Sequence, residues 1–171
     1  NERENISKIV PQIFEGLSSD RVSVKIVVID DNSPDGTADT VKAMDGFGIH
    51  VFLINRSGKL GLGSAYAAGY RWALEDSADC IVQMDADGSH SPEYLPVMFQ
   101  KIEKFDVVIG SRYINGINVI NWPLGRILLS VFASFYVRLI TRMPIKDPTA
   151  GFVGYSKKVL TSIEMNNVRY I

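Results

Sequence analysis

The chain has 171 residues, of which 46% are hydrophobic and 22% are charged, and its formal net charge is −1. These values fit one globular domain with a sizeable core, and the balanced charge gives no sign of nucleic-acid binding. The one cysteine, Cys80, rules out an intrachain disulfide and favours a reducing compartment, so we expect a cytoplasmic protein. No apolar run reaches the about 18 residues that a membrane span needs.

Strand and helix patterns alternate along the chain. β-branched and apolar runs predict strands at 22–30, 49–55, 79–87 and 106–113. Helical patterns follow them at 33–44 (after a turn), 63–77, 91–105 and 123–142. Ser91 and Pro92 are typical of a helix N-cap and first helical position. The alternation predicts an α/β fold, a mostly parallel sheet with helices on both faces. The last glycine-containing stretch, 147–156, is expected to form a tight loop, in which Asp147 could orient another group of the cleft.

Three polar stretches follow the ends of predicted strands: "DDNSPDG", "DADGSH" and "GSRY". Ligands of parallel α/β sheets bind beyond the carboxyl ends of the strands. We therefore expect the functional site where these stretches meet.

Asp85 and Asp87 lie one residue apart at the end of an apolar run. On an extended chain both carboxylates point the same way, and a divalent cation between them would relieve their repulsion. Mg²⁺ and Mn²⁺ prefer oxygen ligands and are often shared between carboxylates and substrate phosphates. Ser89 could add a hydroxyl ligand, whereas His90 is most simply a loop histidine. The pair alone also fits an acidic turn, so both interpretations stay open.

Asp30 and Asp31 end the first predicted strand, before a turn-forming run. We expect one to accept backbone hydrogen bonds from the turn and the other to accept hydrogen bonds from a nucleobase or ribose. Asp35 or Thr37 is a candidate cap for the helix that follows.

The remaining candidate features are weaker. The glycine-rich run 58–65 completes neither a Walker A sequence nor GxGxxG, which argues against a dehydrogenase, although amides at a helix start can bind an anion. Arg112 and Arg126 could grip phosphate or form surface ion pairs. The apolar run 127–140 is too short to span a bilayer, and fits either a core helix or an interfacial helix.

Taken in order, "NERENI", "VVIDDNSPDGT", "KLGLGSAY", "MDADGSHSPEYLP", "GSRY", a Trp…Arg…Ser run and "DPTAGF" resemble the dolichyl-phosphate (polyprenol-phosphate) mannosyltransferases. These are inverting glycosyltransferases with the Rossmann-like GT-A nucleotide-sugar-binding fold. The resemblance covers nearly the whole chain and implies one catalytic domain, 1–171. Relatives begin with a further strand and continue into a basic C-terminal segment, so we expect this chain to lack both.

The resemblance also implies residue roles. Three residues would hold Mg²⁺ or Mn²⁺ on the donor diphosphate: Asp85, Asp87 and Ser89. Four would contact the nucleotide portion of the donor: Glu2, Ile29, Asp31 and Ala86. Three would face phosphates, in particular that of the lipid acceptor: Arg112, Arg126 and Ser130. The catalytic residues among these would be Asp87, Arg112 and Arg126.

The implied reaction moves mannose from GDP-mannose to a polyprenyl monophosphate with inversion. One alternative is another sugar, such as glucose from a UDP-sugar, moved to a lipid phosphate or to a saccharide hydroxyl, with Asp147 as the base. An alternative of another class is a non-catalytic nucleotide-binding module. The implied partners are the nucleotide sugar, the polyprenyl phosphate, the cytoplasmic face of a membrane, and either a second copy or a membrane-anchoring protein.

Overall fold

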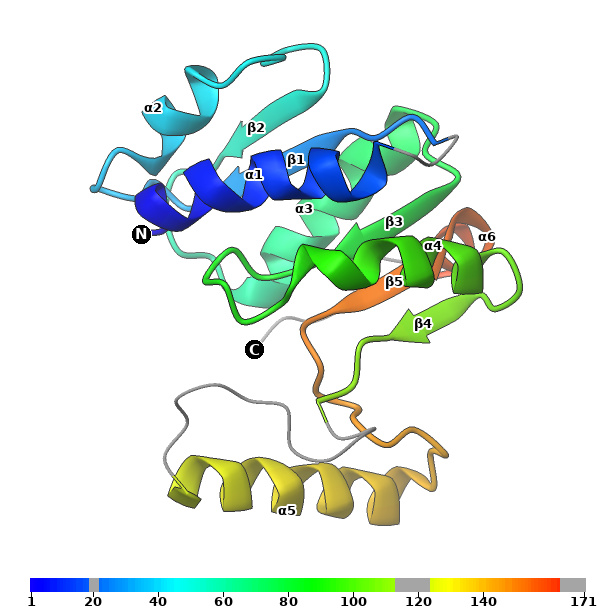
Figure 1. Cartoon of the computed structure of the whole chain (residues 1–171). Coiled ribbons are helices and arrows are strands. Elements are labelled where there is room, and N and C mark those ends of the chain that lie inside the picture. Colours follow the sequence, from blue (N-terminus) through cyan, green and yellow to red (C-terminus); the bar gives the residue numbers. More distant parts are fainter. Residues whose placement is uncertain (19–21, 113–123, 164–171) are drawn as a thin grey trace.

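The computed structural model describes residues 1–18, 22–112 and 124–163, with the backbone alone at 126 and 127 (Figure 1). Its strands are β1 (Ile26–Asp30), β2 (Val51–Asn55), β3 (Cys80–Gln83), β4 (Val107–Ile109) and β5 (Val153–Ser156). Its helices are α1 (Arg3–Leu17), α2 (Thr37–Lys42), α3 (Leu62–Glu75), α4 (Leu95–Ile102), α5 (Leu124–Thr141) and α6 (Lys157–Ser162), with a 3₁₀ turn at Pro92–Tyr94. The expected α/β alternation is confirmed.

The strands pair in two groups. β1 and β2 are parallel, in a register that runs from Ile26 opposite Val51 to Asp30 opposite Asn55. β5 lies between β3 and β4 and is antiparallel to both, so β3 and β4 run parallel to each other. The carboxyl ends of β3 and β4 therefore flank the start of β5.

The loop expected over 147–156 is present at 147–152, but 153–156 form strand β5, so the expectation is wrong there. Gly154 contributed to that expectation, but in the structure it permits close packing. A Cβ on Gly154 would lie 2.5 Å from Ile102 Cδ1, so the glycine lets α4 approach the strand. The neighbouring side chains of Phe152 and Val153 are buried, as expected of a central strand.

Helices cover both faces of the strands (Figure 1). On one face, α1 and α4 enclose a core cluster of Ile9, Ile13, Leu17, Leu95, Met98 and Phe152. A second cluster joins α1 to α2 and β2 through Ile6, Val10, Val41 and Val51. On the other face, α3 packs on β1, where a Cβ on Gly69 would lie 2.8 Å from Ile29 Cδ1.

Helix α1 was not predicted from the sequence. Its buried residues recur at helical spacing, at Ile6, Ile9, Val10, Ile13 and Leu17. Pro11 lies inside the helix and obscures this pattern, because proline removes one backbone hydrogen bond and usually marks a helix end. Packing of the apolar face against both core clusters outweighs that cost.

Helix α5 lies at the periphery, below the end of β4 and the start of β5 in Figure 1. Its large apolar side chains are exposed, among them Leu128, Leu129, Phe132, Phe135, Leu139 and Ile140. The smaller residues Ala133 and Ser134 are better buried. The core-helix interpretation is therefore wrong for these side chains. In the described part of the chain, no helix combines the length and apolar content needed to cross a membrane.

Candidate active site

Charged residues follow the carboxyl ends of four strands, three of which were expected to carry them. Asp30 and Asp31 lie at the end of β1, and Arg56 follows β2. Asp85 and Asp87 come after β3, and Arg112 comes after β4. The polar residues predicted at the carboxyl ends of the strands are thus present, and Arg56 adds to them.

Asp85 and Asp87 are arranged by a turn rather than by strand alternation. β3 ends at Gln83, so the extended-chain reason given for their common direction is wrong. Asp85 Oδ1 accepts a hydrogen bond from the Tyr66 hydroxyl at 3.0 Å. Asp87 Oδ1 accepts one from the Ser89 amide at 2.9 Å, and Gly88 makes the turn with a φ of 79°.

The charges of both carboxylates act on Tyr66. Burial raises the pKa of the Tyr66 hydroxyl, and the negative charges of Asp85 and Asp87 raise it further. Burial also acts to raise the pKa of Asp87, but hydrogen bonds from Ser89 outweigh it, so this pKa is lowered. Asp87 is therefore ionised at neutral pH.

The oxygen donors of the two aspartates are of the chemical type that a divalent cation prefers. In each carboxylate the hydrogen bond described above occupies Oδ1. Over the described residues, no group of three or more His, Cys, Asp or Glu side chains could enclose a metal ion. A hard cation held by two carboxylates and completed by phosphate oxygens needs no such group. Ser89, the expected third ligand, is exposed beside Asp87.

His90 is fixed within the site. Its Nδ1 accepts a hydrogen bond from the Asp85 amide at 3.0 Å, and its ring stacks on Phe152 with centroids 5.2 Å apart. Burial lowers the pKa of His90, and the charge of Arg112 lowers it further, although Asp85 and Asp87 oppose this. A neutral ring matches an unprotonated Nδ1 that accepts a hydrogen bond.

Arg112 is held by Asp147. The Asp147 carboxylate accepts hydrogen bonds from Arg112 Nε at 2.9 Å and Nη2 at 2.7 Å, and its side chain is 0% exposed. Thr149 Oγ1 accepts another from Nη2 at 2.8 Å. Burial acts to raise the pKa of Asp147, but the hydrogen bonds and charge of Arg112 outweigh it, so this pKa is lowered.

Of the two roles expected for the acids at the end of β1, the structure shows the turn role. Asp30 Oδ2 accepts a hydrogen bond from the Ser33 amide at 3.0 Å, which is the predicted turn role. Asp31 instead forms a two-point ion pair with Arg56, at 2.5 Å to Nε and 2.7 Å to Nη2. Arg56 also donates to Ser64 at 2.6 Å, which ties Asp31 to the start of α3.

The other expected site residues take varied positions. The Glu2 amide donates to Thr37 Oγ1 at 3.1 Å, which places Glu2 beside the turn after β1. Asp35 Oδ1 accepts a hydrogen bond from the Thr37 amide at 3.1 Å, but the N-cap of α2 is Gly36, which makes no side-chain cap, so the expected N-cap at Asp35 or Thr37 is wrong. Ile29 packs against α3, and Ala86 packs against the second core cluster. Ser130 is half-buried on α5, and the Arg126 side chain lies outside the described residues.

Sequence reasoning missed Tyr66 and Arg56. Arg56 directly follows a predicted strand, so the rule used for the aspartates could have found it. Tyr66 and Tyr70 are one helical turn apart on α3, and their rings stack with centroids 6.4 Å apart. The four-residue spacing indicates that both tyrosines lie on one face of α3. It does not indicate which carboxylate that face contacts.

This fold, with acids and arginines at the carboxyl ends of its strands, has the arrangement of α/β proteins that bind nucleotides or other anionic ligands. The match to a family model is more specific and spans residues 1–163: the chain belongs to glycosyl transferase family 2. This agrees with the resemblance drawn from the motifs.

Two curated relatives are similar over most of the chain. It is 41% identical to a polyprenol monophosphomannose synthase of Mycolicibacterium smegmatis, over 98% of this chain and 63% of the relative. It is also 41% identical to an undecaprenyl-phosphate mannosyltransferase of Micrococcus luteus, over 84% of this chain and 59% of the relative. The chain therefore spans less than two thirds of the length of these relatives.

A solved structure confirms the fold class. The crystal structure of glucosyl-3-phosphoglycerate synthase from Mycobacterium tuberculosis, in complex with phosphoglyceric acid, matches with a TM-score of 0.65 at 21% identity. The match covers 95% of this chain and 56% of that chain.

Proposed function

We propose that the protein transfers a sugar, mannose from GDP-mannose, to a polyprenyl monophosphate with inversion at the anomeric carbon. The family membership supports a glycosyltransferase, and both relatives are named for polyprenyl-phosphate or phosphomannose chemistry. An acceptor phosphate oxygen would attack the anomeric carbon. The bond from that carbon to the diphosphate would break, and the nucleoside diphosphate would leave with the electron pair.

The observation that carries this proposal is the buried ion pair of Asp147 and Arg112. A sugar hydroxyl acceptor requires a base, and Asp147 was the candidate for that role. Its carboxylate is enclosed, has a lowered pKa and is committed to Arg112. A phosphate monoester has a second pKa near ~6, so it is largely dianionic at neutral pH and needs no base. The phosphate acceptor therefore suits this site better than a hydroxyl.

Asp85 and Asp87 would hold Mg²⁺ or Mn²⁺ against the donor diphosphate. When bound, the cation supplies Lewis-acid neutralisation of the charge on the leaving diphosphate. Tyr66 and Ser89 contribute by fixing one oxygen of each carboxylate in advance. Asp31, oriented by Arg56, would accept hydrogen bonds from the nucleoside.

Arg112 would bind the acceptor phosphate and lower its repulsion from the donor diphosphate. A guanidinium oriented by a buried carboxylate keeps its direction while it binds, which limits the entropy lost on ordering. Arg126 and Ser130, one helical turn apart on α5, would contact the same phosphate. Their position on α5 would bring the lipid acceptor to that helix.

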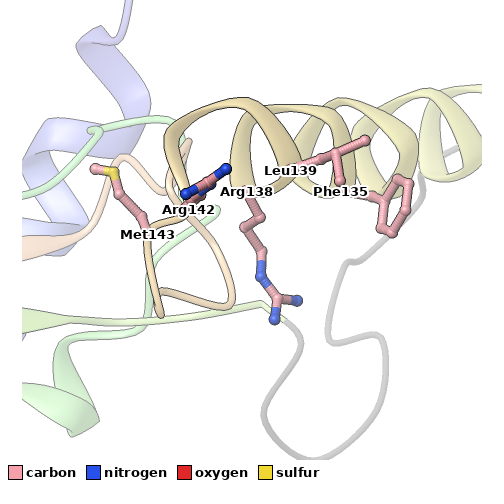
Figure 2. A pocket seen from close by; sticks show the side chains of 5 residues that line it. All are labelled: Phe135, Arg138, Leu139, Arg142 and Met143. Atoms are coloured by element: carbon pink, nitrogen blue, oxygen red, sulfur yellow. The ribbon is translucent and has the colours of Figure 1, made fainter.

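Helix α5 would lie on a membrane surface that carries the lipid acceptor. Near its C-terminal end, Phe135, Arg138, Leu139, Arg142 and Met143 line a pocket of about 280 Å³ (Figure 2). Exposed apolar side chains beside arginines suit an element at the level of lipid headgroups. The location would then be peripheral, and the cytoplasmic side stays a prediction from the sequence.

The test is a transfer assay with a matrix of donors and acceptors. GDP-mannose, UDP-glucose and UDP-GlcNAc are each offered with undecaprenyl phosphate and with a saccharide that carries only hydroxyl groups. We expect product only with GDP-mannose and the lipid phosphate, as the β-linked mannosyl phosphate that inversion gives. Transfer to the saccharide, or preference for a UDP-sugar, would favour the alternative reactions. Nucleotide binding without any transfer would favour the non-catalytic module.

A further inference from the structure

We propose that the segment from Asp147 to Phe152 is the positioning element of the site, which fixes Arg112 at one end and Asp85 at the other. The inference rests on the proposed function, because that function assigns these two residues to the acceptor phosphate and to the cation. The segment itself need not touch either substrate.

The topology puts this segment between the two halves of the site. β5 is antiparallel to its neighbours β3 and β4, so it starts where both of them end. Asp85 follows β3 and Arg112 follows β4. The residues that lead into β5 must therefore pass between the carboxylate and the arginine.

At its first end the segment holds Arg112. Asp147 accepts from the backbone amide of Arg112 at 3.0 Å as well as from its guanidinium. Thr149 adds a further contact at 2.8 Å to Nη2. Because main chain and side chain are both bound, neither can move without breaking hydrogen bonds to a buried carboxylate.

At its other end the segment makes room for the carboxylate of Asp85. A Cβ on Gly151 would lie 2.8 Å from Asp85 Oδ2 and 3.2 Å from His90 Cε1. Gly151 is not among the glycines with positive φ, so the backbone does not demand a glycine here. What the glycine supplies is space for one orientation of the Asp85 carboxylate, the one that Tyr66 binds.

The main chain of Asp85 is held from the same segment. Phe152 stacks on His90 at an interplanar angle of 16°, and His90 Nδ1 accepts a hydrogen bond from the Asp85 amide. Gln83, two residues before Asp85, donates from Nε2 to the Gly151 carbonyl at 3.1 Å. The segment thus contacts Asp85 on its side chain and, through His90, on its backbone.

The discriminating variant is Gly151→Ala. A methyl group here would displace the far end of a flexible side chain, so the Asp85 carboxylate can rotate away at little cost in stability. The rotated carboxylate would lose the Tyr66 hydrogen bond and its position for the cation. Loss of an outer contact to a metal ligand typically weakens binding about 10- to 100-fold.

The experiment measures GDP binding by calorimetry with and without Mn²⁺, together with the melting temperature. For Gly151→Ala we expect Mn²⁺-dependent GDP binding to weaken about 10- to 100-fold with little change in melting temperature. Gly154→Ala is the matched control, since its Cβ would lie 2.5 Å from Ile102 Cδ1 in the core. It should lower the melting temperature and leave GDP affinity unchanged. Gly16→Ala, with only an ordinary contact at 3.9 Å, should change neither.

Wild-type affinity for Mn²⁺ and GDP in Gly151→Ala would overturn the inference. An affinity loss matched by an equal loss in Gly154→Ala would also overturn it, because it would reflect general damage to β5. If wild-type GDP binding did not respond to Mn²⁺ at all, the proposed function would fail first and the inference with it.

Discussion

Asp147 binds Arg112 through three nitrogen atoms of that one residue: the amide at 3.0 Å, Nε at 2.9 Å and Nη2 at 2.7 Å. The two residues are 35 positions apart in the chain, and the carboxylate is fully enclosed. Such a pair orients the arginine before any substrate arrives. Because its carboxylate is enclosed and bound to Arg112, Asp147 is poorly suited to act as a base.

Replacement of Arg112 should separate transfer from donor binding. For Arg112→Ala we expect kcat/KM for the lipid phosphate to fall about 100-fold or more, as for other groups that stabilise charge in a transition state. The dissociation constant for GDP should change less than about threefold, because Asp85 and Asp87 are intact. Arg71→Ala, an exposed site on α3, is the control. Equal losses of transfer and of GDP binding would refute the assigned role.

The ion pair should stabilise the fold in a pH-dependent way. Burial acts to raise the pKa of Asp147, yet Arg112 outweighs it and lowers the pKa below the ordinary value of 3.8. As the pH falls below about 4, the unfolded chain therefore takes up this proton first and the stabilisation is lost. We expect Asp147→Asn to cost about 2 kcal/mol at pH 7 and progressively less toward pH 3. Urea unfolding of both proteins across this range checks it, and a constant difference would contradict it.

The hydroxyl of Tyr66 should matter through Asp85. Tyr66→Phe removes the 3.0 Å hydrogen bond and keeps the ring. We expect Mn²⁺-dependent GDP affinity to fall about tenfold with little change in stability. Tyr94→Phe, at an exposed tyrosine, controls for the loss of a phenol. Unchanged Mn²⁺ dependence in Tyr66→Phe would show that this contact does not orient the ligand.

Helix α5 should bind vesicles through its apolar side. Phe132 is 66% exposed on this helix, and burial of a phenylalanine contributes about 1.5–3 kcal/mol. Phe132→Asp should therefore weaken cosedimentation with phosphatidylglycerol vesicles about tenfold or more. Phe105→Asp, equally apolar and exposed but just before β4, should not. A similar loss in both variants would argue against a membrane role specific to α5.

Local sequence patterns predicted most elements and the polar edge of the site. Each strand that precedes a charged cluster was expected, and so was the placement of Asp85 and Arg112 after successive strands. These features depend on periodicity and turn residues, which act over short stretches.

What the sequence did not reveal depends on tertiary contacts. Pro11 hides helix α1, and Gly154 hides strand β5, because each residue is tolerated only through the packing around it. The roles of Arg56 and Tyr66 follow from contacts with Asp31 and Asp85 that only the fold creates. An orienting role for Asp147 was expected from the sequence, but the identity of its partner, Arg112, likewise needs the geometry.

The central claim is that Asp85 and Asp87 together hold a divalent cation on the donor diphosphate. Crystals grown with Mn²⁺ and GDP, measured for manganese anomalous scattering, test it most directly. The account predicts a manganese peak that contacts both carboxylates and the diphosphate, with Tyr66 and Ser89 still bound to their aspartates. A structure in which GDP is bound but the manganese ion lies elsewhere, without contact to Asp85 or Asp87, would contradict it.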